Sequence, residues 1–178
     1  RLVDDADDLG LGRAPLEPRP LYMRGACYQK MKRLKEAETD FRAALKLDPT
    51  SIDPQSIKVR AELGAVLTDS GRFPEAVEVL EVAVKQKADL FEAQYNLGYV
   101  MLERGFAAKA VEFFKGAIAS DPRFSDAYFN LAMAYEQLGD PQKARPCWRR
   151  YLELEPTGTW AEIARKHGLQ IGFGSWLL

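Results

Sequence analysis

The chain has 178 residues, of which 47% are apolar and 29% are charged, a composition typical of a protein with a buried core. Its formal net charge of −1 gives no general attraction to nucleic acid or to anionic lipid. No apolar run approaches the roughly 18 residues that would span a membrane as a helix. We therefore expect neither a nucleic-acid partner nor insertion into a membrane.

The first 17 residues differ from the rest of the chain. Aspartates interrupt a short apolar run there, and residues 10–20 are rich in glycine and proline. This composition predicts an irregular, partly disordered acidic lead-in over residues 1–17. The chain opens on Arg1 rather than on Met, which leaves open that an upstream segment has been cut away.

A period of 34 residues organises the chain after the lead-in. Each period carries a helical pattern twice, and we describe it as a helix A, a short turn and a helix B. A fixed repeat of this kind predicts a helical solenoid that forms one elongated, all-α domain. The four repeats in register are 18–51, 57–90, 91–124 and 125–158.

Three aligned columns carry the repeat. Helix A has a small residue where helix B must approach closely, at Gly25, Gly64, Gly98 and Ala132. Helix B has a large apolar residue to fill the core, at Phe41, Leu80, Phe114 and Trp148. The turn between the helices favours a residue that tolerates positive φ, and this column reads Lys32, Gly71, Gly105 and Gly139.

Residues 52–56 are an insertion between the first repeat and the second. Asp53 followed by Pro54 is typical of a helix N-cap and a first-turn proline. The pair predicts that helix A of the second repeat begins about one turn early. A slightly long loop is the alternative.

The chain continues beyond the fourth repeat. Thr159 and Glu162 have the spacing of a capping box, which predicts a capping helix over 159–168 that ends at Gly168. Trp160, Ile163 and Ala164 are expected to cover the last apolar face of the solenoid. Residues 169–178 form a strongly apolar tail that this role does not explain.

The aligned columns resemble the tetratricopeptide repeat family, and the resemblance extends over about three quarters of the chain. It implies a right-handed superhelix in which the A helices line a concave groove and the B helices form the convex side. It also implies that the groove binds a peptide or a helix of another protein.

Positions spaced by three and four residues along the A helices, outside the core columns, are expected to face this groove. Tyr95, Tyr99, Phe129 and Met133 would form an aromatic and apolar floor, which suits an extended peptide or an amphipathic helix. The alternative is that some of them pack between neighbouring A helices. The candidate groove residues are Tyr22, Gln29, Lys58, Glu92, Tyr95, Asn96, Tyr99, Asp126, Phe129, Asn130 and Met133, with Ala26, Ala61 and Ala65 beside them.

We find no catalytic or metal-binding constellation in the sequence. His167 is the only histidine, and we expect it to be a surface residue near the end of the capping helix. Cys27 and Cys147 lie in different repeats and are expected to be reduced thiols in the core or partly buried. The sequence therefore predicts no enzyme activity, no cofactor and no metal, and it favours the cytoplasm over secretion without naming a compartment.

The main hypothesis is a non-enzymatic scaffold or adaptor that binds a segment of a partner protein in its concave groove and assembles a complex. One alternative is self-assembly or autoinhibition through residues 169–178. Another is the substrate-docking module of a larger enzyme. The chaperone-tail clamp found in one subclass of the family is disfavoured, since its lysine and asparagine are missing from the matching positions, Tyr22 and Ala26 or Ala61 and Ala65.

Overall fold

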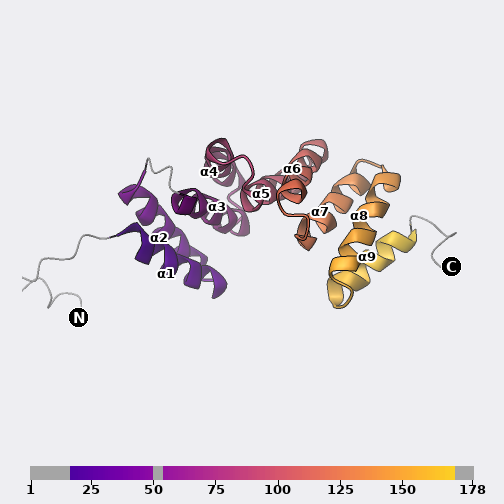
Figure 1. Ribbon diagram of the computed structural model, residues 1–178, viewed down its shortest axis with the longest axis horizontal. Coiled ribbons are helices and arrows are strands. Elements are labelled where there is room, and N and C mark those ends of the chain that lie inside the picture. The colour runs from indigo at the N-terminus through magenta and orange to yellow at the C-terminus, as the bar shows by residue number, and fades with distance from the viewer. Residues whose placement is uncertain (1–16, 50–53, 171–178) are drawn as a thin grey trace, which may run out of the picture.

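The structure is a computed structural model, and it describes residues 17–49 and 54–170. Over these ranges nine helices and no strand follow one another along the long axis of the molecule (Figure 1). The predicted lead-in and apolar tail lie outside the described residues, apart from residue 17 and the end of the last helix. The helices are α1 (Pro18–Lys30), α2 (Leu34–Leu47), α3 (Pro54–Asp69), α4 (Phe73–Gln86), α5 (Phe91–Glu103), α6 (Ala107–Ser120), α7 (Ser125–Gln137), α8 (Pro141–Leu154) and α9 (Thr159–Gln170).

The helices pack as consecutive pairs. The A helices are α1, α3, α5 and α7, and each contacts the B helix that follows it. Each B helix also contacts the next A helix, so that the pairs stack into one row (Figure 1). The A helices in addition contact one another, α1 with α3, α3 with α5 and α5 with α7. They therefore form a continuous layer whose exposed side chains come from successive repeats.

Each pair closes where a large side chain of helix B meets the small residue of helix A. A Cβ atom on Gly25 would lie 2.7 Å from the ring of Phe41, and one on Gly98 would lie 2.7 Å from the ring of Phe114. A Cβ atom on Gly64 would lie even closer to the side chain of Leu80. These large side chains are fully buried, as the aligned columns predict.

The turn column adopts the backbone conformation that its glycines predict. The φ angles are 58° at Lys32, 72° at Gly71, 80° at Gly105 and 71° at Gly139. The following amide then donates to a carbonyl five residues back, as Arg33 does to Tyr28 at 2.9 Å and Phe106 to Met101 at 2.8 Å. This bond satisfies a carbonyl group that the end of helix A would otherwise leave unpaired.

Helix α3 is longer than the other A helices, as the Asp53-Pro54 pair predicts. It begins at Pro54 and has 16 residues, compared with 13 in each of α1, α5 and α7. Asp53 itself lies outside the described residues.

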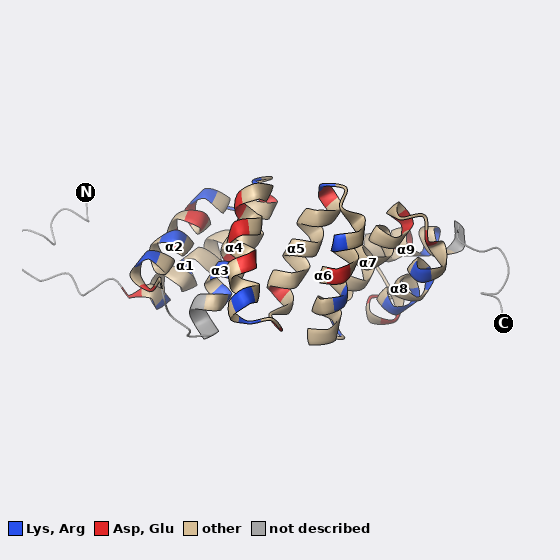
Figure 2. Ribbon diagram, turned by 90° about the horizontal axis from the view of Figure 1, so that it is seen from above, with Lys and Arg blue, Asp and Glu red and all other residues tan. Residues whose placement is uncertain are grey.

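Ion pairs join the first two B helices across the surface. An Nη of Arg72 lies 2.6 Å from Oε2 of Glu38, and an Nη of Arg42 lies 3.1 Å from Oε2 of Glu75. Figure 2 shows the acidic positions along α4 and the basic positions on α2 that contribute to this network. Because all of these side chains except Glu38 are substantially exposed, the network contributes modestly to stability and chiefly aligns α2 with α4.

The capping helix begins at Thr159, where its predicted range begins, but its N-cap residue and its last residue differ from the prediction. Thr159 is the first helical residue rather than the N-cap, because Glu162 N–H donates to the carbonyl of Gly158, whose φ is 98°. Gly168 does not end the helix, which continues to Gln170. Packing of α9 on α8 outweighs the low helix propensity of one glycine.

The residues that dock α9 also differ from the prediction. Ala161 and Ala164 are fully buried, whereas Trp160 is 62% exposed and does not cover the core. His167 lies near the end of α9 and is partly exposed, as expected, and its Nδ1 lies 2.7 Å from Oε2 of Glu136. The same carboxylate accepts a 2.7 Å hydrogen bond from Trp148 Nε1, so Glu136 joins α7, α8 and α9.

The two cysteines are free thiols in different environments. Cys147 is buried, its Sγ donates to the carbonyl of Lys143 at 3.4 Å, and burial raises its pKa to about 11. Cys27 is exposed, which contradicts the expectation of a core or partly buried residue. It lies on a face of α1 that no described helix covers.

A substitution in the turn after α1 tests the backbone argument. Lys32 is the only described residue other than glycine with positive φ, and its ion pair with Asp69, at 3.5 Å, joins two exposed side chains. Lys32→Gly is expected to raise the free energy of unfolding by about 0.5–1 kcal/mol, since the strain it relieves exceeds the entropy that glycine adds to the unfolded chain. Urea denaturation measures this change.

The matched control is Lys30→Gly, in the last turn of α1. Its backbone is right-handed, so glycine there should lower the unfolding free energy by about 1 kcal/mol. Equal destabilisation by both substitutions would contradict the argument.

Candidate binding groove

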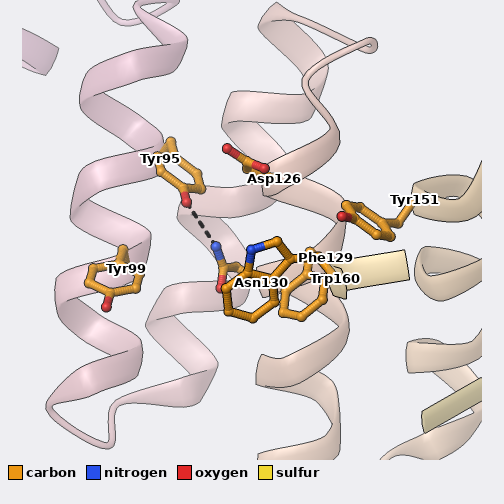
Figure 3. Close-up of a pocket in the computed structure, with 7 residues that line it drawn as sticks. All are labelled: Tyr95, Tyr99, Asp126, Phe129, Asn130, Tyr151 and Trp160. Carbon is orange, nitrogen blue, oxygen red and sulfur yellow. Dashed lines mark hydrogen bonds between the residues drawn. The ribbon is translucent and has the colours of Figure 1, made fainter. Parts of the chain in front are cut away.

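Helices α5, α7, α8 and α9 line a pocket in the C-terminal half of the molecule (Figure 3). Its volume is about 300 Å³, and it opens to solvent. The side chains come from α5, α7, α8 and α9, so four helices of three successive units build it. The lining residues are Tyr95, Tyr99, Asp126, Phe129, Asn130, Tyr151 and Trp160.

One hydrogen bond joins the two A helices across the pocket. Asn130 Nδ2 donates to the hydroxyl of Tyr95 at 2.9 Å (Figure 3). The ring of Tyr95 also packs edge-on against Phe124, with centroids 4.8 Å apart. Burial, reinforced by the charge of Asp126, raises the pKa of Tyr95 well above its ordinary value. The hydroxyl therefore keeps its proton at neutral pH and can donate a hydrogen bond to a ligand.

Phe129 is the centre of an aromatic cluster that forms another wall. Its ring makes edge-to-face contacts with Trp148, Tyr151 and Trp160 at centroid distances of 4.8, 5.2 and 5.3 Å. Such contacts fix the relative orientation of rings and stabilise the packing beyond the area they bury. The pocket wall is thus preorganised, although Trp160 presents most of its surface to solvent.

The charges around the pocket are acidic. Asp126 is exposed as a residue, but its carboxyl borders the aromatic lining, where burial and the charge of Glu155 raise its pKa. Burial and the same two carboxylates raise the pKa of Tyr151. Burial, Glu103 and Asp69 raise the pKa of Tyr99. The formal charges that act on these side chains are therefore negative.

Other predicted groove residues gather in the N-terminal half, around a carboxylate that the prediction missed. Burial raises the pKa of Glu62, and Gln29 and Lys58 partly offset this effect. The charge of Glu92 raises the pKa of Glu62 further. Oε2 of Glu92 is buried without a hydrogen-bond partner. Burial is also the main cause of the raised pKa of Tyr22, which Lys58 opposes.

Three predicted positions do not take part as expected. Ala61 is only 1% exposed and belongs to the core, so its assignment to the groove is wrong. Asn96 donates to the main-chain carbonyl of Glu92 at 2.8 Å and is bound to its own helix. Met133 is partly buried against the core and does not line the pocket.

The 34-residue period contained a signal for the residues that were missed. Trp160 follows Asp126 by one period, and α9 thus repeats the A-helix pattern. Glu62 precedes Asn96 by one period and belongs to the same column. Tyr151 stands where the three earlier repeats have alanine, and its ring extends from the core to the pocket.

The described residues offer no metal centre, since no group of three or more His, Cys, Asp or Glu side chains among them is arranged to hold an ion. None of the helices in the described part of the chain is long and apolar enough to cross a membrane.

A row of stacked helix pairs that presents a pocket is typical of helical-repeat proteins, which act mainly through their binding surfaces. Family models described as "Tetratricopeptide repeat" match residues 18–51 and 125–157, and one described as "TPR repeat" matches residues 64–105. These matches together cover more than half of the chain, which therefore belongs to the tetratricopeptide repeat family.

Solved structures have the same fold. A tetratricopeptide repeat protein from Parabacteroides merdae ATCC 43184 is 18% identical with a TM-score of 0.69, over 86% of this chain and 59% of its own. MamA from Desulfovibrio magneticus RS-1 is 26% identical with a TM-score of 0.67, over 79% and 76% of the two chains. These likenesses confirm the predicted fold class, an all-α right-handed superhelical solenoid.

YrrB, described as a TPR protein with an unusual peptide-binding site, is 24% identical with a TM-score of 0.67. The likeness covers 92% of this chain and 79% of YrrB. The chain spans less than two thirds of the length of the Parabacteroides protein. No curated protein sequence matches the chain.

The raised pKa of Asp126 predicts a pH dependence of stability. The Asp126 carboxyl keeps its proton to a higher pH in the folded protein than in the unfolded chain. It therefore makes folding less favourable as the pH rises above 3.8, the ordinary pKa of this carboxyl. Asp126→Asn is therefore expected to raise the melting temperature at pH 7. The difference from the wild type should shrink as the pH approaches 3.8.

Thermal melts followed by circular dichroism from pH 3 to 8 measure this effect. Glu112→Gln, at an exposed position of α6, is the matched control and should change little at any pH. A lower melting temperature for Asp126→Asn at pH 7 would contradict the prediction.

Proposed function

We propose that the protein is a non-enzymatic scaffold that holds a segment of a partner protein along the layer of A helices, with the aromatic pocket as its main contact. The repeat fold supports a protein-interaction role in general. The observation that carries the specific proposal is the pocket itself, in which five aromatic side chains and two polar ones converge from four helices.

The chemistry of the pocket favours binding over catalysis. Rigid aromatic rings supply a large contact area at a low cost in side-chain entropy, as in the central residues of many protein interfaces. Asp126 and the hydroxyl of Tyr95 can orient polar groups of the ligand. His167, the only histidine, is engaged with Glu136 in docking α9 and does not line the pocket.

The other hypotheses receive less support. A nucleic-acid ligand does not match the acidic pocket, because phosphate groups would be repelled. Self-assembly through residues 169–178 stays a prediction, since that tail lies outside the described side chains. The same groove could also bind a substrate protein for an enzyme domain elsewhere in a longer chain.

Panning a phage-displayed library of random peptides against the immobilised protein tests the proposal. Selected peptides should lose at least tenfold in affinity for the double variant Tyr99→Ala and Trp160→Ala, since both rings border the pocket and Trp160 is largely exposed. Isothermal titration measures the affinities, and circular dichroism checks that helicity is unchanged.

The matched control is Phe106→Ala, which removes an exposed ring at the start of α6 outside the pocket. It should leave the affinities unchanged. Peptides that bind the double variant as tightly as the wild type would overturn the groove assignment.

A further inference from the structure

The aromatic pocket contains a carboxylate that the described part of the chain does not neutralise. Asp126 borders the pocket beside Tyr95, Tyr151 and Trp160 (Figure 3). No described ion pair or hydrogen bond involves its side chain. A carboxylate among aromatic rings is unusual unless a cation compensates it, because desolvation disfavours its charge.

Every charged group that perturbs the pocket residues is an acid. The pKa shifts of Tyr95, Tyr99, Tyr151 and Asp126 have burial as their first cause, and the charges that add to it are carboxylates, together with the phenol of Tyr99 at Tyr95. No lysine or arginine in the described residues opposes these shifts. The acidic groups that act on the pocket are Asp69, Glu103, Asp126 and Glu155.

The N-terminal half of the groove and the first helices provide a contrast. There, Lys58 partly offsets the carboxylates, and Glu38 pairs with Arg42 and Arg72. The acidic pocket is thus a local feature of the C-terminal half and not a general property of the surface.

The pocket rings are also free of the chain's own cations. In the described residues, lysine and arginine lie over the rings of Tyr28, Phe106 and Tyr135, none of which lines the pocket. The π faces of aromatic rings attract cations, and the attraction grows when the cation is desolvated. The pocket therefore combines two features that favour a cation, aromatic faces and a carboxylate.

We infer that the pocket receives a basic side chain, arginine or lysine, from the segment that the groove binds, with its charged group beside Asp126 and its methylene stem against the aromatic rings. This inference rests on the proposed function and specifies its ligand. A volume of about 300 Å³ is at the lower end for ligand pockets and suits one long side chain. Long basic side chains pack their apolar stems on rings while the charged head finds a polar partner.

The inference separates a basic partner segment from the chain's own apolar tail. Residues 169–178 contain no lysine or arginine, so they cannot supply the cation. Removing them should leave the affinity for a basic peptide unchanged. A large gain in affinity after this truncation would identify the tail as the occupant and overturn the inference.

The closing experiment uses the panned library and a pair of isosteric variants. Peptides selected by the wild type should share one position at which arginine or lysine is enriched. Asp126→Asn should weaken their binding roughly tenfold, while Glu112→Gln, on the exposed face of α6, should not. Replacing the shared basic residue of the peptide with norleucine should lower its wild-type affinity and abolish the difference between Asp126→Asn and wild type.

The outcomes distinguish the inference from the proposed function. If no selected peptide depends on Tyr99 and Trp160, both fail. If peptides depend on those rings but show no enriched basic position, or bind Asp126→Asn as tightly as the wild type, the groove stands and the basic-ligand inference is overturned.

A second readout does not depend on the library. N-acetyl-arginine amide should shift the indole N–H resonance of Trp160 in the full chain, with N-acetyl-norleucine amide as the neutral control. Equal shifts from the two compounds, or an undiminished arginine response in Asp126→Asn, would also overturn the inference.

Discussion

Each repeat depends on one close contact, in which a large side chain of helix B fills the space left by a small residue of helix A. Because Gly98 has no Cβ, the ring of Phe114 can lie against the backbone of α5, and Ala132 and Trp148 are the equivalent pair in the last repeat. This contact commits one face of every A helix to its partner. The residues on the opposite face are then free, and the repeat aligns them along the molecule.

The pocket arises where this regular arrangement is modified by larger side chains. Phe129 contacts both the buried Trp148 and the exposed Trp160, so the same ring packs on the core and lines the pocket. Rigidity of the wall is therefore inherited from the core packing. The aromatic contacts stabilise the fold, whereas the ionised carboxylate of Asp126 destabilises it because burial disfavours the charge. Residues that bind ligands often reduce the stability of the free protein in this way.

The sequence predicts the fold more completely than the site, for a physical reason. The core column of Gly98 and the turn column of Gly105 are governed by backbone geometry, which recurs in every repeat. Groove residues depend on rotamers and neighbours, so Asn96 bonds to its own helix whereas Asn130, one period later, bonds to Tyr95. Five of the seven pocket residues were nonetheless among the predicted groove positions. The other two, Tyr151 and Trp160, lie on α8 and α9, outside the A helices to which the predicted groove positions belong.

Helix α9 resembles the A helices on one face but differs from them at one position. It continues the A-helix pattern, with Ala161 buried one period after Ala127. The position that is glycine or alanine in every earlier A helix is Lys166 in α9, and its side chain is exposed. A long charged side chain at that point would hold off a ring such as Phe114 and would have to be desolvated to admit another B helix. Lys166 thus makes this face of α9 unsuited to the close contact by which the other A helices receive a B helix.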